Sequence, residues 1–104
     1  DTGKIFYIDS PAGGCTISLP SASSDLTGWT AKFIVKTAPT GSDEIRIAGT
    51  VLTGSDVGGA WTITSNQVKG AGAGGTTTVT GDTCEIVCVD GATATFVASC
   101  ASQN

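Results

Sequence analysis

The chain contains no histidine among its 104 residues. Histidine is the general base that enzymes use most often near neutral pH, and it completes the Ser/His and Cys/His nucleophilic systems. It is also a frequent zinc ligand. The missing imidazole therefore removes these reaction classes, together with every zinc site that needs a histidine.

Charged residues are scarce as well, at 13% of the chain, against roughly 25% in an average protein. Because the few basic residues form no stripe, we expect no nucleic-acid partner. No apolar run approaches the ~20 residues that span a bilayer, so we expect no membrane partner either. A surface of Ser, Thr, Gly and Ala in place of charges suits contact with other proteins. The basic residues are Lys4, Lys32, Lys36, Arg46 and Lys69.

Carboxylates are the remaining source of acid–base chemistry. Asp43 and Glu44 are adjacent, and Asp56, Asp82 and Asp90 fall in expected loops. A glycosidase needs two carboxyl groups facing each other across roughly 5 to 10 Å, whereas a loop Asp beside Gly usually shapes a turn through its side chain. Calcium would need a spaced series of oxygen ligands, and no such loop is visible. We therefore expect no catalytic residue, no metal and no cofactor.

Polar and apolar side chains alternate along most of the chain, and no useful length has the helical period. The connections are too short for βαβ crossovers. We therefore expect an all-β fold, an antiparallel β-sandwich or partly closed barrel of six to eight short strands, with little or no helix. The expected strands are residues 4–8, 15–19, 29–36, 44–47 (continuing at 50–53), 60–64, 76–80, 84–89 and 95–100.

Residues 1–104 are expected to form a single β domain, because a chain of this length can bury a core of its own. The first residue is Asp1 rather than Met, so residues that precede it in a longer chain remain an alternative. Residues 70–75 are glycine and alanine only, and we expect a mobile or closely packed loop there. This stretch lacks the pattern of a phosphate-binding loop.

Three aromatic residues, Tyr7, Trp29 and Trp61, could line a sugar-binding face, because aromatic rings stack on the apolar faces of sugars. Both tryptophans, however, fall on the apolar side of an alternating segment. Since large aromatic residues are usually well buried, we favour core positions for them.

The four cysteines, Cys15, Cys84, Cys88 and Cys100, fit either disulfides or buried thiols. Cys84 and Cys88 are four residues apart on one expected strand, so they are separated by about 13 Å at ~3.3 Å per residue. That distance excludes a bond between these two and a shared tetrahedral metal.

Several short motifs occur in an order that is similar to a known family. The chain opens with Lys-Ile-Phe-Tyr-Ile-Asp at residues 4–9 and Cys-Thr-Ile-Ser-Leu-Pro at residues 15–20. Phe-Ile-Val-Lys at 33–36, Ile-Arg-Ile-Ala-Gly at 45–49 and Glu-Ile-Val-Cys-Val-Asp-Gly at 85–91 follow. Together they resemble a small β domain of bacteriophage tail-fibre, head-fibre and capsid-decoration proteins. The chain differs from that pattern after the last turn, where Thr95-Phe96 stands in place of Trp-Tyr.

The resemblance implies a non-enzymatic structural protein on the virion exterior, either a capsid decoration (cement) protein or a head-fibre module. It implies a homotrimer whose partners are its own copies and a major capsid or other virion protein. A tail-fibre or receptor-binding module is an alternative of the same class. A secreted bacterial adhesin or carbohydrate-binding domain is the alternative from another class, and two disulfides together with a surface-exposed Trp61 or Trp29 would favour it.

Phage proteins assemble in a reducing cytoplasm, so the resemblance also favours free thiols, with Cys15, Cys84 and Cys88 reduced and buried. In the closing hairpin, a five-residue loop at 90–94 would set Cys84 opposite Cys100. A four-residue loop at 90–93, which the resemblance suggests, sets Cys84 opposite Ser99 instead. We therefore expect no Cys84–Cys100 bond, and Cys100 as the most reactive thiol.

Overall fold

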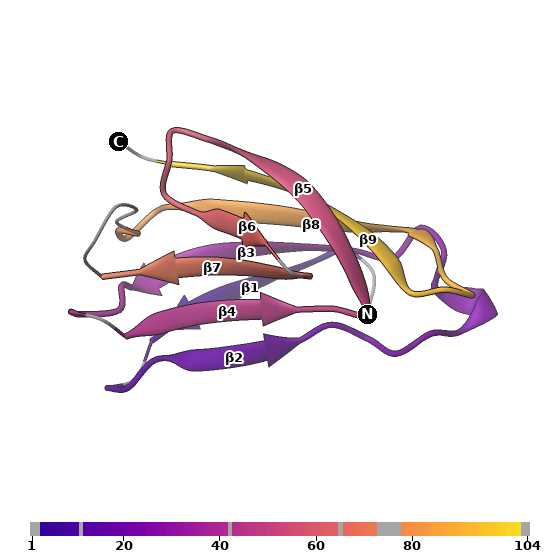
Figure 1. Ribbon diagram of the computed structural model, residues 1–104, viewed down its shortest axis with the longest axis horizontal. Coiled ribbons are helices and arrows are strands. Elements are labelled where there is room, and N and C mark those ends of the chain that lie inside the picture. The colour runs from indigo at the N-terminus through magenta and orange to yellow at the C-terminus, as the bar shows by residue number, and fades with distance from the viewer. Residues whose placement is uncertain (1–2, 11, 42, 65, 73–77, 103–104) are drawn as a thin grey trace.

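The computed structural model describes residues 3–10, 12–41, 43–64, 66–72 and 78–102, which fold as two β-sheets packed on each other (Figure 1). The expected all-β sandwich is confirmed, and the sheets do not close into a barrel. The described residues contain nine strands where six to eight were expected. Their only helical segment is the short 3-10 turn η1, Ser24–Leu26. No helix there is long and apolar enough to cross a membrane.

The larger sheet has five strands in the order β1-β3-β8-β9-β5. Strand β3 pairs antiparallel with β8, and β8 antiparallel with β9. The two outermost strands, β1 and β5, run parallel to their neighbours β3 and β9. The strand bounds are Lys4–Asp9 for β1, Thr30–Thr37 for β3, Thr83–Asp90 for β8, Thr95–Ala101 for β9 and Val51–Val57 for β5.

The smaller sheet has four strands in the order β2-β4-β7-β6 and lies in front of the larger one in Figure 1. Strand β2 runs parallel to β4, while the β4–β7 and β7–β6 pairs are antiparallel. The bounds are Cys15–Ser18 for β2, Glu44–Ala48 for β4, Gln67–Ala71 for β7 and Thr62–Thr64 for β6.

Both sheets are therefore mixed rather than purely antiparallel. Parallel pairs arise because the chain changes sheet between neighbouring strands: β2 of the small sheet separates β1 from β3, and β3 of the large sheet separates β2 from β4. Alternation along a strand shows which side chains face inward, but it does not show which strand lies alongside. The alternation pattern therefore could not predict the parallel pairs, and the expectation of purely antiparallel sheets is wrong.

The core lies between the sheets and consists of the inward residues that alternation predicts. On β3, Ala31, Phe33 and Val35 are buried, and the two residues between them are only partly buried. Six large apolar side chains are almost fully removed from water: Phe96, Ile45, Ile47, Ile86, Val35 and Val68.

The glycine-rich stretch begins as a strand, because β7 includes Gly70 and Ala71. A Cβ atom on Gly70 would lie 2.5 Å from the Oγ1 atom of Thr78 and 3.0 Å from a ring carbon of Trp61. Close packing therefore explains a glycine at this position. Residues 73–77, which include the rest of the stretch and the start of the strand expected at 76–80, lie outside the described residues, and 78–80 are not in a strand.

The register of the closing hairpin corrects the expectation for the cysteines. Asp90 pairs with Thr95, and an irregularity between Cys88 and Asp90 shifts the ladder by one residue, so that Cys84 lies opposite Cys100. The two residues form a disulfide, with their Cα atoms 4.0 Å apart. The expectation of no Cys84–Cys100 bond, with Cys100 as a reactive thiol, is wrong because the β-bulge supplies the shift that a uniform ladder lacks.

Candidate interaction surface

Two of the carboxylates that the sequence offered shape turns. Asp90 accepts a hydrogen bond of 3.1 Å from the N–H of Ala92, two residues further on. Asp82 is fully buried and accepts one of 2.8 Å from the N–H of Val79. These are the local side-chain-to-backbone bonds expected of loop Asp residues.

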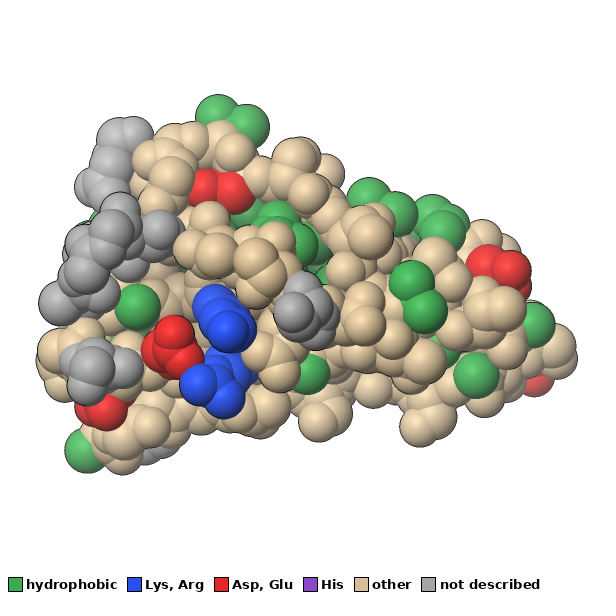
Figure 2. Space-filling view, viewed as in Figure 1, with side chains coloured by type: hydrophobic (Ala, Val, Ile, Leu, Met, Phe, Trp, Pro, Cys, Tyr) green, Lys and Arg blue, Asp and Glu red, His purple; other side chains and the backbone are tan. Residues whose placement is uncertain are grey.

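Asp43 and Glu44 border a polar hollow of about 370 Å³ beside the start of β2. Asp43 accepts a 3.0 Å hydrogen bond from the N–H of Gly13, and Glu44 forms an ion pair with Arg46. The Arg46 hydrogen bond is the main reason why the pKa of Glu44 lies below its ordinary value, and the nearby charges of Arg46 and Lys69 act in the same direction. Figure 2 shows basic side chains gathered over β4 and β7, beside an acidic one.

These charges satisfy one another and give no metal site. Within the described ranges, no group of three or more His, Cys, Asp or Glu residues could hold a metal ion. The hollow is bordered by an ion pair between two residues of one strand, which is a common structural feature of protein surfaces.

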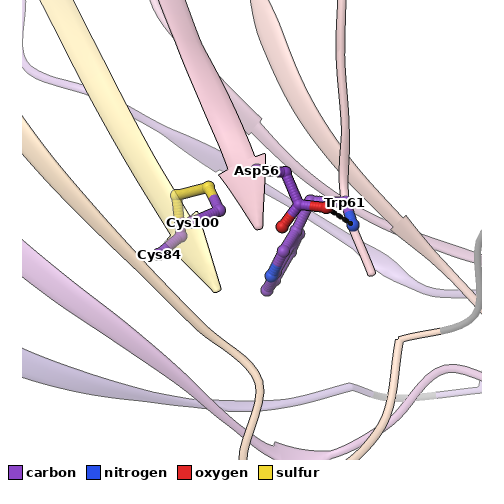
Figure 3. Close-up of a disulfide and its surroundings, with 4 residues drawn as sticks. All are labelled: Asp56, Trp61, Cys84 and Cys100. Carbon is purple, nitrogen blue, oxygen red and sulfur yellow. Dashed lines mark hydrogen bonds between the residues drawn. A yellow bond between two sulfur atoms is a disulfide. The ribbon is translucent and has the colours of Figure 1, made fainter. Parts of the chain in front are cut away.

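The remaining carboxylate, Asp56, lies on β5 rather than in a loop, in register with Cys100. Figure 3 shows it next to Trp61 and near the disulfide. Its Oδ2 atom accepts a 3.3 Å hydrogen bond from the backbone N–H of Trp61. The other carboxylate oxygen and the indole Nε1 of Trp61 are buried without a hydrogen-bond partner. Because these atoms are buried, Asp56 and Trp61 form no open site.

The tryptophans lie where the alternation placed them, toward the core. Trp61 is buried, and Trp29 is half-buried with its ring edge-on to Phe96 at a centroid distance of 5.9 Å. Tyr7 is exposed on β1. The three aromatic residues thus form no common face for a sugar.

Outside the disulfide, Cys88 is buried and Cys15 is half-buried, both as free thiols. Burial raises the pKa of the Cys15 thiol. Because the thiolate is the reactive form, a raised pKa makes this cysteine less reactive than an exposed one.

Thiol alkylation should count these groups. Under denaturing, non-reducing conditions we expect Cys15 and Cys88 to be labelled, and Cys84 and Cys100 to be labelled only after reduction. In the native protein, Cys15 should react slowly and Cys88 should be protected, as mass spectrometry of digested protein would show. A Cys15→Ser variant should lose one label. Four labels without reductant would contradict the disulfide.

The outer face of the five-stranded sheet, the side that points away from the smaller sheet, is an open surface. Sixteen residues in the central part of this face include two charged ones, Lys32 and Glu85, whose side chains form an ion pair at 3.8 Å. Lys4 at the start of β1 and the exposed Lys36 near the end of β3 add two basic groups at its margins. A large surface with so little charge has the composition of a protein contact. The central part of the outer face consists of Ile5, Tyr7, Thr30, Lys32, Ile34, Val51, Thr53, Ser55, Val57, Thr83, Glu85, Val87, Thr95, Val97, Ser99 and Ala101.

A shallow hollow of about 320 Å³ lies across β1, β3, β8 and β9 and is lined by Lys4 and by the Lys32–Glu85 pair. Val87 and Val97 line its floor and are paired across the two strands. The apolar floor and the flanking charge pair offer a partner one place for an apolar side chain and one for a polar contact.

The exposed fraction of the apolar side chains is greatest on the two edge strands of this sheet, β1 and β5. Ile5 and Tyr7 on β1 are 56% and 67% exposed, and Val57 on β5 is 73% exposed. The sequence carried a signal for the first edge. Residues 5–8 are apolar without a break, so β1 presents apolar side chains to both faces, unlike a strand with one solvated face.

The chain matches no known protein family, no characterised protein and no solved structure. The outer face and the β1 edge are therefore identified from the geometry of this chain alone.

Proposed function

We propose that this chain is a non-enzymatic structural protein of a virion exterior, a capsid decoration or head-fibre module that attaches through the outer face of its five-stranded sheet. The observation that carries the proposal is the composition of that face, whose sixteen central residues carry one ion pair, while Lys4 and Lys36 lie at its margins. Burying such a face against another protein removes apolar area from water at little electrostatic cost.

The motifs at residues 4–9, 15–20 and 85–91 support the virion assignment over other attachment proteins, because they resemble phage decoration and fibre domains. The same resemblance gives the partners as copies of the chain in a homotrimer and a major capsid protein. A tail-fibre module would use the same surface at another place on the particle.

Copy number in purified particles tests the assignment. Quantitative mass spectrometry should find the chain in a high, symmetry-related ratio to the major capsid protein. A chain absent from the particles, or present only in traces, would rule the assignment out.

The attachment face has a test of its own, in which purified variants bind particles depleted of the chain. Val57→Glu should weaken binding about tenfold or more, because it places a charge in a contact that excludes water. Thr16→Glu is the matched control: Thr16 is exposed on β2 of the other sheet, and we expect wild-type binding. Equal loss in both variants would contradict attachment through the outer face.

A second candidate, a secreted bacterial adhesin or carbohydrate-binding domain, is favoured by the Cys84–Cys100 disulfide. Disulfides persist mainly in oxidising compartments. The buried Trp61 and half-buried Trp29 do not favour a glycan site. The stage at which the Cys84–Cys100 bond forms in the producing cell separates the two candidates.

A further inference from the structure

Strand β1 leaves three consecutive apolar side chains in water. Ile5 and Tyr7 belong to the outer face, while Phe6, 41% exposed, lies on the opposite face and stacks on Phe33 at a centroid distance of 5.4 Å. Within the described part of the chain, β3 is the only strand that pairs with β1, so the other edge of β1 is open. An edge of this kind is a template for a further strand.

Proteins usually protect such edges with charges, proline or bulges. Here the protection is confined to the ends, where Lys4 begins the strand and an irregularity precedes Asp9. The centre, residues 5–7, has none of these devices. We propose that β1 pairs antiparallel with β1 of a second copy of this chain, so that two five-stranded sheets join into one. This inference stands whether or not the chain belongs to a virion.

The pattern of exposure points to a second copy as the partner. Because Phe6 and its neighbours Ile5 and Tyr7 lie on opposite faces, a strand that covers them must carry apolar side chains on both of its own faces. Strand β1 itself meets that requirement. A two-fold axis perpendicular to the sheet keeps each face on its own side, as a continuous sheet needs.

A two-fold axis through Phe6 gives the most apolar register. Phe6 then lies opposite Phe6 of the second copy, and Ile5 lies opposite Tyr7 on the outer face, twice over. Aromatic residues opposite β-branched ones are favourable cross-strand pairs. All three exposed side chains of β1 are covered in this register.

Charge selects the antiparallel direction. Strand β1 starts at Lys4 and ends at Asp9, so an antiparallel copy brings the positive start of each strand toward the negative end of the other. A parallel copy would bring like charges together at both ends, and like charges directly opposite each other are destabilising.

The other edge of the sheet suits a partner strand less well. Between Val51 and Val57, strand β5 carries Thr53, Gly54 and Ser55, so its centre offers little apolar surface. The β1 edge is therefore the one on which a second copy gains most from burial.

The contact is small. The three side chains expose roughly 300 Å² per copy, given 150 to 250 Å² for a whole large aromatic side chain. This is less than the roughly 800 Å² per partner in a standard stable interface. Dimers should therefore appear at high micromolar to millimolar concentrations and become tight only where another contact holds the copies together.

Sedimentation equilibrium from micromolar to millimolar concentrations tests the pairing. Wild-type protein should shift toward a dimer, or a hexamer if copies also form trimers. Tyr7→Glu should weaken this step about tenfold or more, because it places a charge opposite Ile5. Thr16→Glu, at an exposed residue on β2 of the smaller sheet, should leave the step unchanged.

A compensating variant tests the register. Ile5→Lys alone should also weaken the dimer, whereas Ile5→Lys combined with Tyr7→Glu should restore it, because the introduced lysine faces the introduced glutamate on both sides of the axis. A combined variant that stays monomeric would overturn the register through Phe6. Both mutated positions are more than half-exposed, so the fold should survive, as circular dichroism would confirm.

The inference fails if wild-type protein stays monomeric at millimolar concentration, or if its oligomer is insensitive to Tyr7→Glu. A trimer of that second kind would agree with the proposed function while overturning the β1 pairing. If the chain is absent from purified particles but forms a dimer that Tyr7→Glu disrupts, the β1 pairing stands and the proposed function is overturned.

Discussion

Replacing Phe96 by alanine should lower the free energy of unfolding by about 3 to 5 kcal/mol, the usual cost of removing a buried phenylalanine side chain. Phe96 on β9 is 0% exposed and lies in the core between the sheets. It also contacts Trp29 edge-on, an arrangement that contributes about 0.5 to 1.5 kcal/mol beyond burial. Since a domain of this size has a total stability of about 5 to 15 kcal/mol, the variant should be close to unfolding at 37 °C.

The measurement is urea unfolding followed by tryptophan fluorescence, because Trp29 and Trp61 both report on the core. Phe6→Ala is the matched control. It removes the same side chain from a position that is 41% exposed and stacked on Phe33, so the expected loss is about 1 to 2 kcal/mol at concentrations where the chain is monomeric. Equal losses in the two variants would mean that the core is not centred on Phe96.

Much of the fold follows from the sequence because side-chain direction in a strand has a period of two residues. Alternation along residues 29–36 places Phe33 and Val35 on the inward face, and both are buried on β3. Side-chain direction in a strand depends only on the local backbone. Alternation therefore predicts burial wherever one face of a strand is buried and the other meets water.

The remaining features depend on parts of the chain that are distant in sequence. Strand β7 was not expected, because Gly70 has no side chain to alternate, and its close contact with Thr78 becomes visible only in the fold. The parallel pairs depend on which connections between strands cross from one sheet to the other, and alternation does not show this. The outer face was indicated only in general terms, by low charge, because the residues that form it come from five strands.

The cysteine pairing shows how one residue can reverse a conclusion. The loop between β8 and β9, residues 91–94, has the four residues that were expected, but starts one residue later. The bulge between Cys88 and Asp90 then moves the ladder by one position and brings Cys84 opposite Cys100. A bulge leaves little trace in the alternation of a strand that ends two residues further on.

Removing this disulfide should have the other large effect. The bond closes a loop with a sequence separation of 16 residues, and a loop of that size is worth about 3 kcal/mol through the entropy of the unfolded chain. For a domain of about 100 residues, such a loss should lower the Tm by about 10 to 15 °C. Reductant added to the wild-type protein should produce that shift in a thermal melt, and the Cys84→Ala/Cys100→Ala variant should show it without reductant.

Two controls isolate the bond. Reductant should not shift the Tm of the double variant further, and Cys15→Ser, which alters a half-buried free thiol, should respond to reductant as the wild type does. A wild-type Tm that is the same with and without reductant would contradict a stabilising Cys84–Cys100 bond.

The time at which the bond forms also separates the two candidate functions. A secreted adhesin acquires its disulfides as it enters an oxidising compartment, whereas a virion protein assembles in a cytoplasm that keeps thiols reduced. Trapping thiols with an alkylating agent at the moment of lysis should therefore find Cys84 and Cys100 free inside the producing cell and bonded in released particles. The reduced domain would then fold and assemble with about 3 kcal/mol less stability, which the bond would restore after release. Recovery of the bonded form from an oxidising compartment, before any particle has formed, would favour the secreted domain instead.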